Sequence, residues 1–394
     1  MRIPRIVVLA CVLSMGAMIA AFAAQDRPRA RDLGIAPGAG APGPANAITD
    51  VAGVRVGHQT VIRGDAVRTG VTAVLPHGGN LFREKVPGAV FIGNAFGKLA
   101  GSTQVDELGT IETPIVLTNT LAVGTALDAV VRWTIAQPGN ENVRSVNGLV
   151  GETNDGTLND IRALPLTRDD VMAAIGIAAS GAVAEGAVGA GTGTIAFGWK
   201  GGIGTSSRRV TQQANSWTVG VLVQTNYGGR LTIGGVPVWK ELDPAKNLGF
   251  GDSGFGDLIN RQISNHQISN SPDGSCLIVV ATDAPLDARD LKRLAARAIF
   301  AMARTGSTYS NGSGDFAIAF STAEGNRLTA TNGPQPRTVL PTDAVSALFE
   351  ATLDATEEAI YNSLLKATDT TANGRTVRAL PIEALRALLK KYGR

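Results

Sequence analysis

The stretch SPDGSCLIVVATDAP, residues 271–285, places a tight Asp-Gly turn directly before a strongly apolar run. That run, residues 276–282, consists mainly of β-branched and other apolar residues without polar alternation. This pattern is typical of a strand that is buried on both faces of a sheet. We therefore expect a central strand here, with Ser275 at its start behind the turn.

The segments after this strand alternate between helical and strand-like patterns. Residues 285–304 and 342–365 carry apolar residues at helical spacing, and residues 316–321 form another apolar run. Residues 382–391 have the composition of a last helix. The order strand, helix, strand, helix, helix predicts a sheet with helices packed on it.

The first two thirds of the chain show short apolar runs separated by glycine and proline. A polar segment, residues 250–274, contains Gln-Ile-Ser-Asn twice and predicts an exposed loop. The strand-like runs are residues 54–56, 72–75, 89–92, 115–117, 217–224 and 230–236, and helical composition covers 121–137 and 168–185.

Composition indicates a globular protein with balanced charge. The 394 residues are 44% hydrophobic and 18% charged, which is enough to bury a large core. The 36 basic and 33 acidic residues are interspersed and give a net charge of only +3. Because no basic stripe results, nucleic acid is not expected as a partner.

The N-terminus has the layout of a secretory signal peptide over residues 1–24, with two arginines, an apolar run and small residues up to Ala24. An uncleaved membrane anchor is the alternative, because the apolar run is about long enough to span a bilayer. We expect a periplasmic or secreted protein with no stable membrane span after signal cleavage. Residues 25–46 are rich in Arg, Pro, Gly and Ala without periodicity, which predicts a linker or disordered arm.

Sequence signatures of metal, nucleotide and triad sites are missing. His58, His77 and His266 lack HExxH spacing, and Cys276 is the only cysteine expected in the exported chain, so a disulfide or thiolate zinc site is excluded. The glycine-rich run 189–194 lacks the Lys-Ser/Thr of a phosphate loop, and Gly312-Ser313-Gly314 precedes a strand-like run instead of a helix. No metal or other cofactor is expected.

A serine without a histidine still has one general route to nucleophilic catalysis. If backbone cleavage makes the serine the first residue of a chain, its own α-amine can act as the base. An α-amine titrates near pH 7.7–8.0 in model peptides, close to working pH. Ser275 fits this requirement, because a polar loop and the Asp273-Gly274 turn precede it and a rigid strand follows. The alternative is an ordinary turn serine that enters a strand.

Several long motifs, in order, resemble the family of L-aminopeptidase D-amidase/D-esterases and β-peptidyl aminopeptidases. The resemblance covers the chain from about residue 47 to its end. The motifs are ITDVAGVRVGH (48–58), ETPIVLTNTLAVG (112–124), GETNDGTLND (151–160), EGAVGAGTGTIAFGWKGGIGTSSR (185–208), VQTNYG (223–228), DGSCLIVVATDAPL (273–286) and RTGSTYSNGSGDFAIAFST (304–322).

This resemblance implies an α+β fold, a four-layer αββα sandwich like that of N-terminal nucleophile hydrolases with different strand connectivity. It also implies self-cleavage between Gly274 and Ser275 into an α chain, residues 47–274, and a β chain, residues 275–394. The two chains stay associated, and several αβ units form a homo-oligomer. The expected reaction removes an N-terminal residue from a small peptide, amide or ester, and some members of the family accept β-amino acids.

The resemblance also assigns site residues. Ser275 is the new N-terminal nucleophile, Ser313 is placed to hydrogen-bond its α-amine, and Asp315 is the acidic partner that orients Ser313. Asn226 is the oxyanion donor. The substrate-binding candidates are Glu152, which would hold the substrate ammonium, and Thr157, at the position of a tyrosine that supplements the oxyanion hole in a relative.

Each assignment has a structural alternative. Asn226 fits a cap of the turn that follows it, and Ser313 and Asp315 fit turn chemistry in a glycine-rich loop. Glu152 fits a solvated loop acid or a helix N-cap. Cys276 is a rival nucleophile, although a cysteine in a buried strand usually behaves as a small hydrophobic residue.

Two other functions remain open at this stage. Acyl transfer occurs on a related self-cleaving fold that uses a threonine at the cut, and Ser275 together with the export signal argues against it. An uncleaved exported binding protein would keep the loop 250–274 intact and show no turnover.

Overall fold

The computed structural model describes residues 27–244, 274–329 and 333–394. The signal peptide expected over residues 1–24 and nearly all of the polar loop 250–274 lie outside the described residues. Within the described part, no helix combines the length and the apolar character needed to cross a bilayer.

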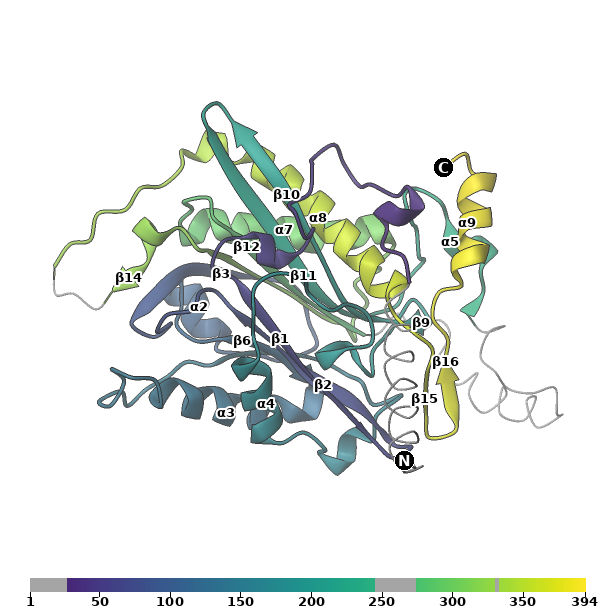
Figure 1. Ribbon diagram of the computed structural model, residues 1–394, viewed down its shortest axis with the longest axis horizontal. Helices are drawn as coiled ribbons and strands as arrows, with labels where there is room; N and C mark the ends of the chain where they lie inside the picture. The colour runs from purple at the N-terminus through teal and green to yellow at the C-terminus, as the bar shows by residue number, and fades with distance from the viewer. Residues whose placement is uncertain (1–26, 245–273, 330–332) are drawn as a thin grey trace, which may run out of the picture.

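Two β-sheets form the inner layers of the molecule (Figure 1). The first has five strands in the order β1-β2-β6-β7-β4: β1 (Arg55–Arg63), β2 (Val67–Leu75), β6 (Ile115–Asn119), β7 (Leu149–Thr153) and β4 (Leu99–Ala100). The second has seven strands, in the order β10-β11-β12-β13-β3-β14 with β5 paired to β3. Its members are β10 (Gly202–Gln212), β11 (Asn215–Asn226), β12 (Ser275–Thr282), β13 (Gly314–Ser321), β3 (Glu84–Ala95), β14 (Leu328–Thr329) and β5 (Thr110–Ile111).

Helices cover the outer face of each sheet (Figure 1). Helices α3 (Val123–Ile135) and α4 (Arg168–Gly176) pack on the first sheet, and α7 (Ala288–Thr305) and α8 (Ser346–Leu365) pack on the second. The layer order α, β, β, α confirms the expected four-layer sandwich. The remaining elements are α2 (Ser102–Leu108), α5 (Val238–Glu241), α9 (Ile382–Lys391) and the two-stranded pairs β8 (Ile195–Ala196) with β9 (Trp199–Lys200) and β15 (Thr370–Ala372) with β16 (Arg375–Val377).

Strand β12 lies between two hydrophobic cores, as its uninterrupted apolar run predicts. One set of side chains, including Ile278 and Val280, packs with the helices on the outer face. The alternate set, including Leu277 and Val279, packs with the first sheet. Since full burial of an aliphatic side chain stabilises a fold by about 1.5–3 kcal/mol, this strand is a rigid base for Ser275 at its first position.

Two segments differ from the sequence prediction. The helix expected over 168–185 ends at Gly176, because Ala179 leaves the helix and forms an isolated bridge with Val56. The run 230–236 forms no named strand and contributes single bridges, such as Ile233 with Val236. The apolar residues of 230–236, such as Ile233 and Val236, are thus buried although they belong to no named strand.

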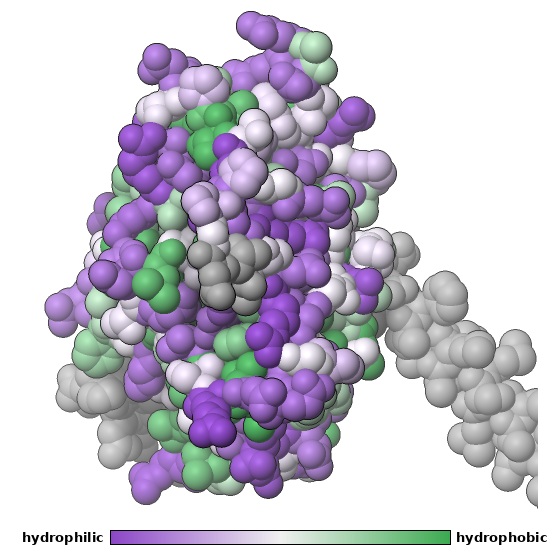
Figure 2. Space-filling view, turned by 90° about the vertical axis from the view of Figure 1, so that its left-hand side faces the viewer, coloured by the Kyte–Doolittle hydropathy of each residue, from purple (hydrophilic) through white to green (hydrophobic). Residues whose placement is uncertain are grey.

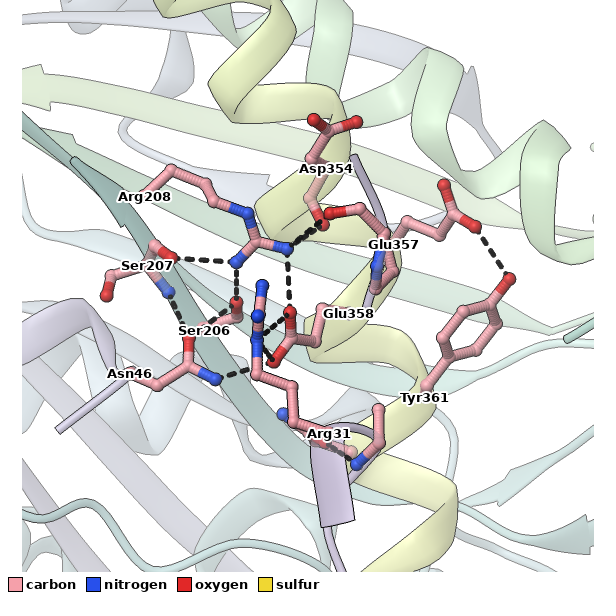
Figure 3. Close-up of polar contacts among 12 residues, drawn as sticks. Arg31, Asn46, Ser206, Ser207, Arg208, Asp354, Glu357, Glu358 and Tyr361 are labelled. Atoms are coloured by element: carbon pink, nitrogen blue, oxygen red, sulfur yellow. Dashed lines mark hydrogen bonds and ion pairs between the residues drawn. The ribbon is translucent and has the colours of Figure 1, made fainter. Parts of the chain in front are cut away.

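The prediction of a linker or disordered arm over residues 25–46 is wrong for the described residues, 27–46. These residues pack against the body of the protein. Ala30 is fully buried, and its N–H donates to Asn362 Oδ1 of α8 at 2.9 Å. Arg31 Nε donates to both carboxylate oxygens of Glu358 in α8 at 3.0 Å (Figure 3). Arginine hydrogen bonds anchor this segment together with a few apolar contacts of Ala30, Leu33 and Ile35 with the core, which are too few and too irregular for hydrophobic periodicity to reveal.

Some charges at the surface are paired with a neighbour. The face in Figure 2 is largely hydrophilic, and its hydrophobic side chains occur in small separate groups. Exposed ion pairs join Lys292 to Asp106 at 2.6 Å and Arg378 to Asp369 at 2.6 Å. Such pairs contribute little to stability but keep the surface electrostatically mixed.

Candidate active site

The ends of three neighbouring strands meet at one edge of the second sheet. Asn226, the last residue of β11, pairs with Ser275, the first residue of β12. Ser275 in turn pairs with Gly314, the first residue of β13, because β12 and β13 run parallel. The sheet therefore brings Asn226, Ser275 and the segment 313–315 together although they lie far apart in sequence.

The peptide bond between Gly274 and Ser275 lies at the centre of this edge. Ser275 Oγ donates to the Gly274 carbonyl oxygen at 2.7 Å, and the Gly314 N–H donates to the same oxygen at 3.0 Å. Ser275 is only 5% exposed. Its hydroxyl thus lies beside the carbonyl that self-cleavage would attack, and that carbonyl already accepts a backbone N–H.

Ser313 and Asp315 form a buried pair beside this bond. Ser313 Oγ donates to Asp315 Oδ1 at 2.8 Å, and Asp315 is fully buried. Burial raises the pKa of Asp315 to about 6, against the opposing hydrogen bonds from Ser313 and the Cys276 backbone. With this pKa the Asp315 carboxylate is mostly ionised at neutral pH and accepts the hydrogen bond from Ser313.

Asn226 is oriented by a bond from outside its own turn. Its Oδ1 accepts the Ile195 N–H at 3.0 Å, which leaves Nδ2 as the end of the amide that can donate. Asn226 is 8% exposed and adjoins Ser275 across the sheet. The bond from Ile195 differs from the local turn cap considered as an alternative.

Glu152 is a buried carboxylate on β7 of the first sheet, so it is not the solvated loop acid considered as an alternative. Its Oε1 accepts the Lys98 backbone N–H at 3.0 Å, and its Oε2 accepts the Thr120 hydroxyl. A Cβ atom at Gly97 would lie 3.3 Å from Glu152 Oε1 and 3.2 Å from Gly314 Cα. Gly97 therefore lies between Glu152 and the strand edge that carries Ser275.

The side chains of two further candidates from the sequence, Thr157 and Cys276, do not take part in the contacts described above. Thr157 is half-buried in the turn after β7, and among the described residues no hydrogen bond ties its hydroxyl to Ser275 or Asn226. Cys276 is fully buried within the core under the helices, and burial raises the pKa of its thiol well above its ordinary range. A thiol that resists ionisation there is a poor nucleophile.

The described histidines have structural partners. His58 Nδ1 lies 2.9 Å from Thr72 Oγ1, and His77 Nε2 lies 2.8 Å from the Glu84 carbonyl oxygen. His266 falls outside the described residues. In the portion that the structure describes, no cluster of three or more His, Cys, Asp or Glu side chains could hold a metal ion.

Comparison with known proteins now decides the family. The model of peptidase family S58 matches residues 46–377, which is most of the chain. The chain belongs to peptidase family S58. This membership confirms the family resemblance inferred from the motifs and places the protein among the peptidases.

Three relatives of this S58 peptidase cover nearly its whole length. A beta-peptidyl aminopeptidase BapA from Sphingosinicella microcystinivorans is 44% identical over 396 residues, covering 96% of each chain. A Burkholderia sp. beta-aminopeptidase structure has a TM-score of 0.81 at 38% identity, covering 93% of this chain and 99% of its own. The L-aminopeptidase D-Ala-esterase/amidase of Ochrobactrum anthropi, described as a variant of the Ntn hydrolase fold, has a TM-score of 0.81 at 37% identity, with the same coverage.

Sequence reasoning missed several groups around the site of this S58 peptidase. Thr120 and the Lys98 backbone hold Glu152, and the Gly314 and Ile195 backbone N–H groups bind Gly274 and Asn226. Three of these four groups are backbone amides, which every residue except proline carries. Only Thr120, inside the motif 112–124, has a side chain that a sequence could single out.

Proposed function

We propose that this protein is an exported, self-processing serine aminopeptidase. The observation that carries the proposal is the position of Ser275 at the start of β12, paired with Asn226 on one side and Gly314 on the other. The hydroxyl of Ser275 already contacts the carbonyl group of the preceding residue. Membership of family S58 and the aminopeptidase relatives support the same reading.

Self-processing begins with attack of Ser275 Oγ on the Gly274 carbonyl carbon. The C–N bond breaks as the ester forms, and the hydroxyl proton passes to the departing nitrogen, which becomes the Ser275 α-amine. Water then hydrolyses the ester and leaves a Gly274 carboxylate with a free Ser275 hydroxyl. The Gly314 N–H, 3.0 Å from the Gly274 oxygen, stabilises the charge that develops on that oxygen.

Turnover uses the same serine with its new α-amine. The amine takes the Ser275 hydroxyl proton, Oγ attacks the substrate carbonyl, and the leaving amine or alcohol receives the proton. Water then releases the acyl group. Asn226 Nδ2 donates to the tetrahedral oxyanion, and Ser313, held by Asp315, hydrogen-bonds the α-amine.

Glu152 explains why the substrate would carry a free amino terminus. Its buried carboxylate is held by Thr120 and the Lys98 backbone, yet each oxygen keeps a lone pair for the substrate ammonium. The Lys98 ammonium lies 3.7 Å from Oε1 on a side chain that is 57% exposed, so it is free to move aside. We propose peptides, amides or esters with an N-terminal residue as substrates, including β-amino acids as in the named relatives.

The export proposal is compatible with the contacts of Arg27. Signal cleavage near Ala24 would leave Arg27 almost at the new terminus. Arg27 Nε donates to the Leu365 carbonyl at 2.7 Å, and Lys366 Nζ donates to the Arg27 carbonyl at 2.6 Å. The exported chain would then keep the contacts that Arg27 makes with Leu365 and Lys366 at the end of α8.

The deciding experiment is the intact mass of the purified protein with N-terminal sequencing of each fragment. We expect two chains, the smaller beginning Ser-Cys-Leu-Ile. Ser275→Ala should remain a single inactive chain, because it lacks the attacking oxygen. Cys276→Ala is the matched control and should still be cut and active, which separates the hydroxyl from the neighbouring thiol. One uncut chain of the wild-type protein would contradict self-processing, and an uncut chain without turnover would favour the binding-protein alternative.

A further inference from the structure

We propose that Lys200 is a positioning residue that acts on Asn226 through the peptide group joining Thr194 to Ile195. This inference deepens the proposed function, because it takes Asn226 as the oxyanion donor. Lys200 would make that donor stronger and fix its direction without touching the substrate.

Lys200 is a fully buried cation at the end of β9. Its Nζ donates to the carbonyl oxygens of Gly191, Thr194 and Gly201 at 2.9, 2.9 and 2.8 Å. An ammonium has three protons, so these carbonyls take the place of its water shell. All three acceptors belong to the single segment 191–201, which Lys200 therefore gathers around itself.

The Thr194–Ile195 peptide group connects this cation to the site. Its carbonyl oxygen accepts from Lys200 Nζ, and its N–H donates to Asn226 Oδ1 at 3.0 Å. Ammonium, peptide and side-chain amide thus form one hydrogen-bonded row. Each bond in such a row polarises the next, so the cation favours a more positive Asn226 Nδ2, the end that would meet the oxyanion.

A neutral residue would hold this segment at a lower desolvation penalty. Burial of a charge is unfavourable even when its hydrogen bonds are made, and it lowers the pKa of Lys200 from its ordinary value, whereas the three carbonyl acceptors around Nζ favour the charged form. The Asp155 carboxylate opposes that shift without a direct hydrogen bond to Nζ. A charge retained there is better explained by an electrostatic task than by loop anchoring alone.

A double-mutant cycle tests the coupling. Lys200→Met and Asn226→Ala are made singly and together, and kcat and KM are measured on processed enzyme with alanine and β-alanine p-nitroanilides. Lys200→Met alone should lower kcat about tenfold, part of the roughly 10²–10³-fold typical of losing an oxyanion donor, with KM within about twofold. On the Asn226→Ala background the same change should lower kcat less than about twofold.

Two further variants separate charge from loop anchoring. Lys200→Gln keeps a donor for the carbonyls but removes the charge, and we expect the same loss of kcat. Lys292→Met removes an exposed cation paired with Asp106 and should leave kcat unchanged. If Lys200→Met does not fold, the cycle is run with Lys200→Gln.

Three results would overturn the Lys200 proposal. These are losses that multiply in full on the Asn226→Ala background, wild-type turnover by folded Lys200→Gln, and failure of both variants to fold, which would assign Lys200 to the fold alone. Wild-type turnover by Asn226→Ala is a different result, because it would reject the oxyanion assignment of the proposed function itself.

Discussion

Gly274 is a residue that no other amino acid can replace in this arrangement. A Cβ atom there would lie 2.1 Å from the Asn226 carbonyl oxygen and 2.5 Å from Tyr227 Cα. Both contacts are with backbone, which cannot move aside cheaply. The side-chain-free residue lets the backbone at Gly274 lie close against the end of β11, where its carbonyl oxygen accepts from the Ser275 hydroxyl.

The buried carboxyl of Asp315 predicts a second acid step in the pH dependence of turnover. Its ionised form accepts the Ser313 hydroxyl, and burial raises its pKa to about 6 in the intact chain. The protonated α-amine of a processed chain would lower that value, so we expect the step at or below about pH 6. Because the α-amine itself protonates below about pH 8, log(kcat/KM) should fall with a slope of one below pH 8 and two below the Asp315 pKa.

A pH–rate profile of wild type beside Asp315→Asn checks this expectation. The variant carries no carboxyl at this position, so its profile should keep a slope of one down to the lowest pH at which it stays folded. Profiles of identical shape would show that Asp315 does not titrate in the working range.

At the scale of elements, the segment 27–46 ties the start of the chain to β10 and α8. Arg29 donates to the carbonyl oxygens of Asn46 and Thr205 at 2.7 Å and pairs with Glu185 at 2.8 Å. Arg31 binds Glu358, which also pairs with the fully buried Arg208 at 2.6 Å (Figure 3). In the proposed processed form, this segment, which precedes the α chain, would hold a helix of the β chain.

Arg29→Ala is expected to destabilise the protein by about 3 kcal/mol, because it strands the buried Glu185 carboxylate. Burial already raises the pKa of Glu185 from 4.5 to about 7, and Arg29 opposes that rise. That value holds with Arg29 present, so the folded variant takes up a proton at a pH above 7, where the unfolded chain does not. The destabilisation relative to wild type should therefore be full well above pH 7 and shrink as the pH falls through 7, where Glu185 becomes neutral in both proteins.

Urea unfolding at pH 8.5 and pH 5.5 measures this effect, on a Ser275→Ala background so that one chain unfolds. Arg31→Ala is the control, since Glu358 keeps Arg208 and Asn46 as partners and the loss should be smaller. An equal loss for both variants, or a loss from Arg29→Ala that grows on acidification, would refute the Glu185 argument.

At the scale of the whole molecule, the seven-stranded sheet mixes segments from both sides of Ser275. Its order β10-β11-β12-β13-β3-β14 places β12 and β13 between β11 and β3, which precede Ser275 in the chain. Hydrogen-bonded ladders therefore cross between the proposed α and β chains on both sides of β12 and β13. Cutting one peptide bond removes none of these ladders.

Native mass spectrometry is expected to show the two chains together, in a multiple of the αβ mass, although a denaturing gel separates them. The shared sheet accounts for the association, and the family resemblance accounts for the multiple. Separate chain masses under native conditions would contradict the first expectation, and a single αβ unit would contradict the second.

The sequence by itself determined the elements whose pattern is local. The run 276–282 predicted a strand buried on both faces, apolar spacing predicted α7 and α8 within a few residues of their bounds, and composition predicted α9. Motif resemblance identified the family and selected Ser275, Ser313, Asp315 and Asn226 as candidates. Hydrophobic periodicity and motifs can be recognised in a sequence because each is formed by residues that lie close together along the chain.

Tertiary structure alone decided the contacts that join distant segments. The segment 27–46 lacks an apolar pattern and packs through arginine bonds to groups of β10 and α8, more than 150 residues away. The row from Lys200 through Thr194–Ile195 to Asn226 passes through a backbone amide, and the Lys98 amide holds Glu152. Backbone groups are the same at almost every residue, so only the folded chain shows which of them meet.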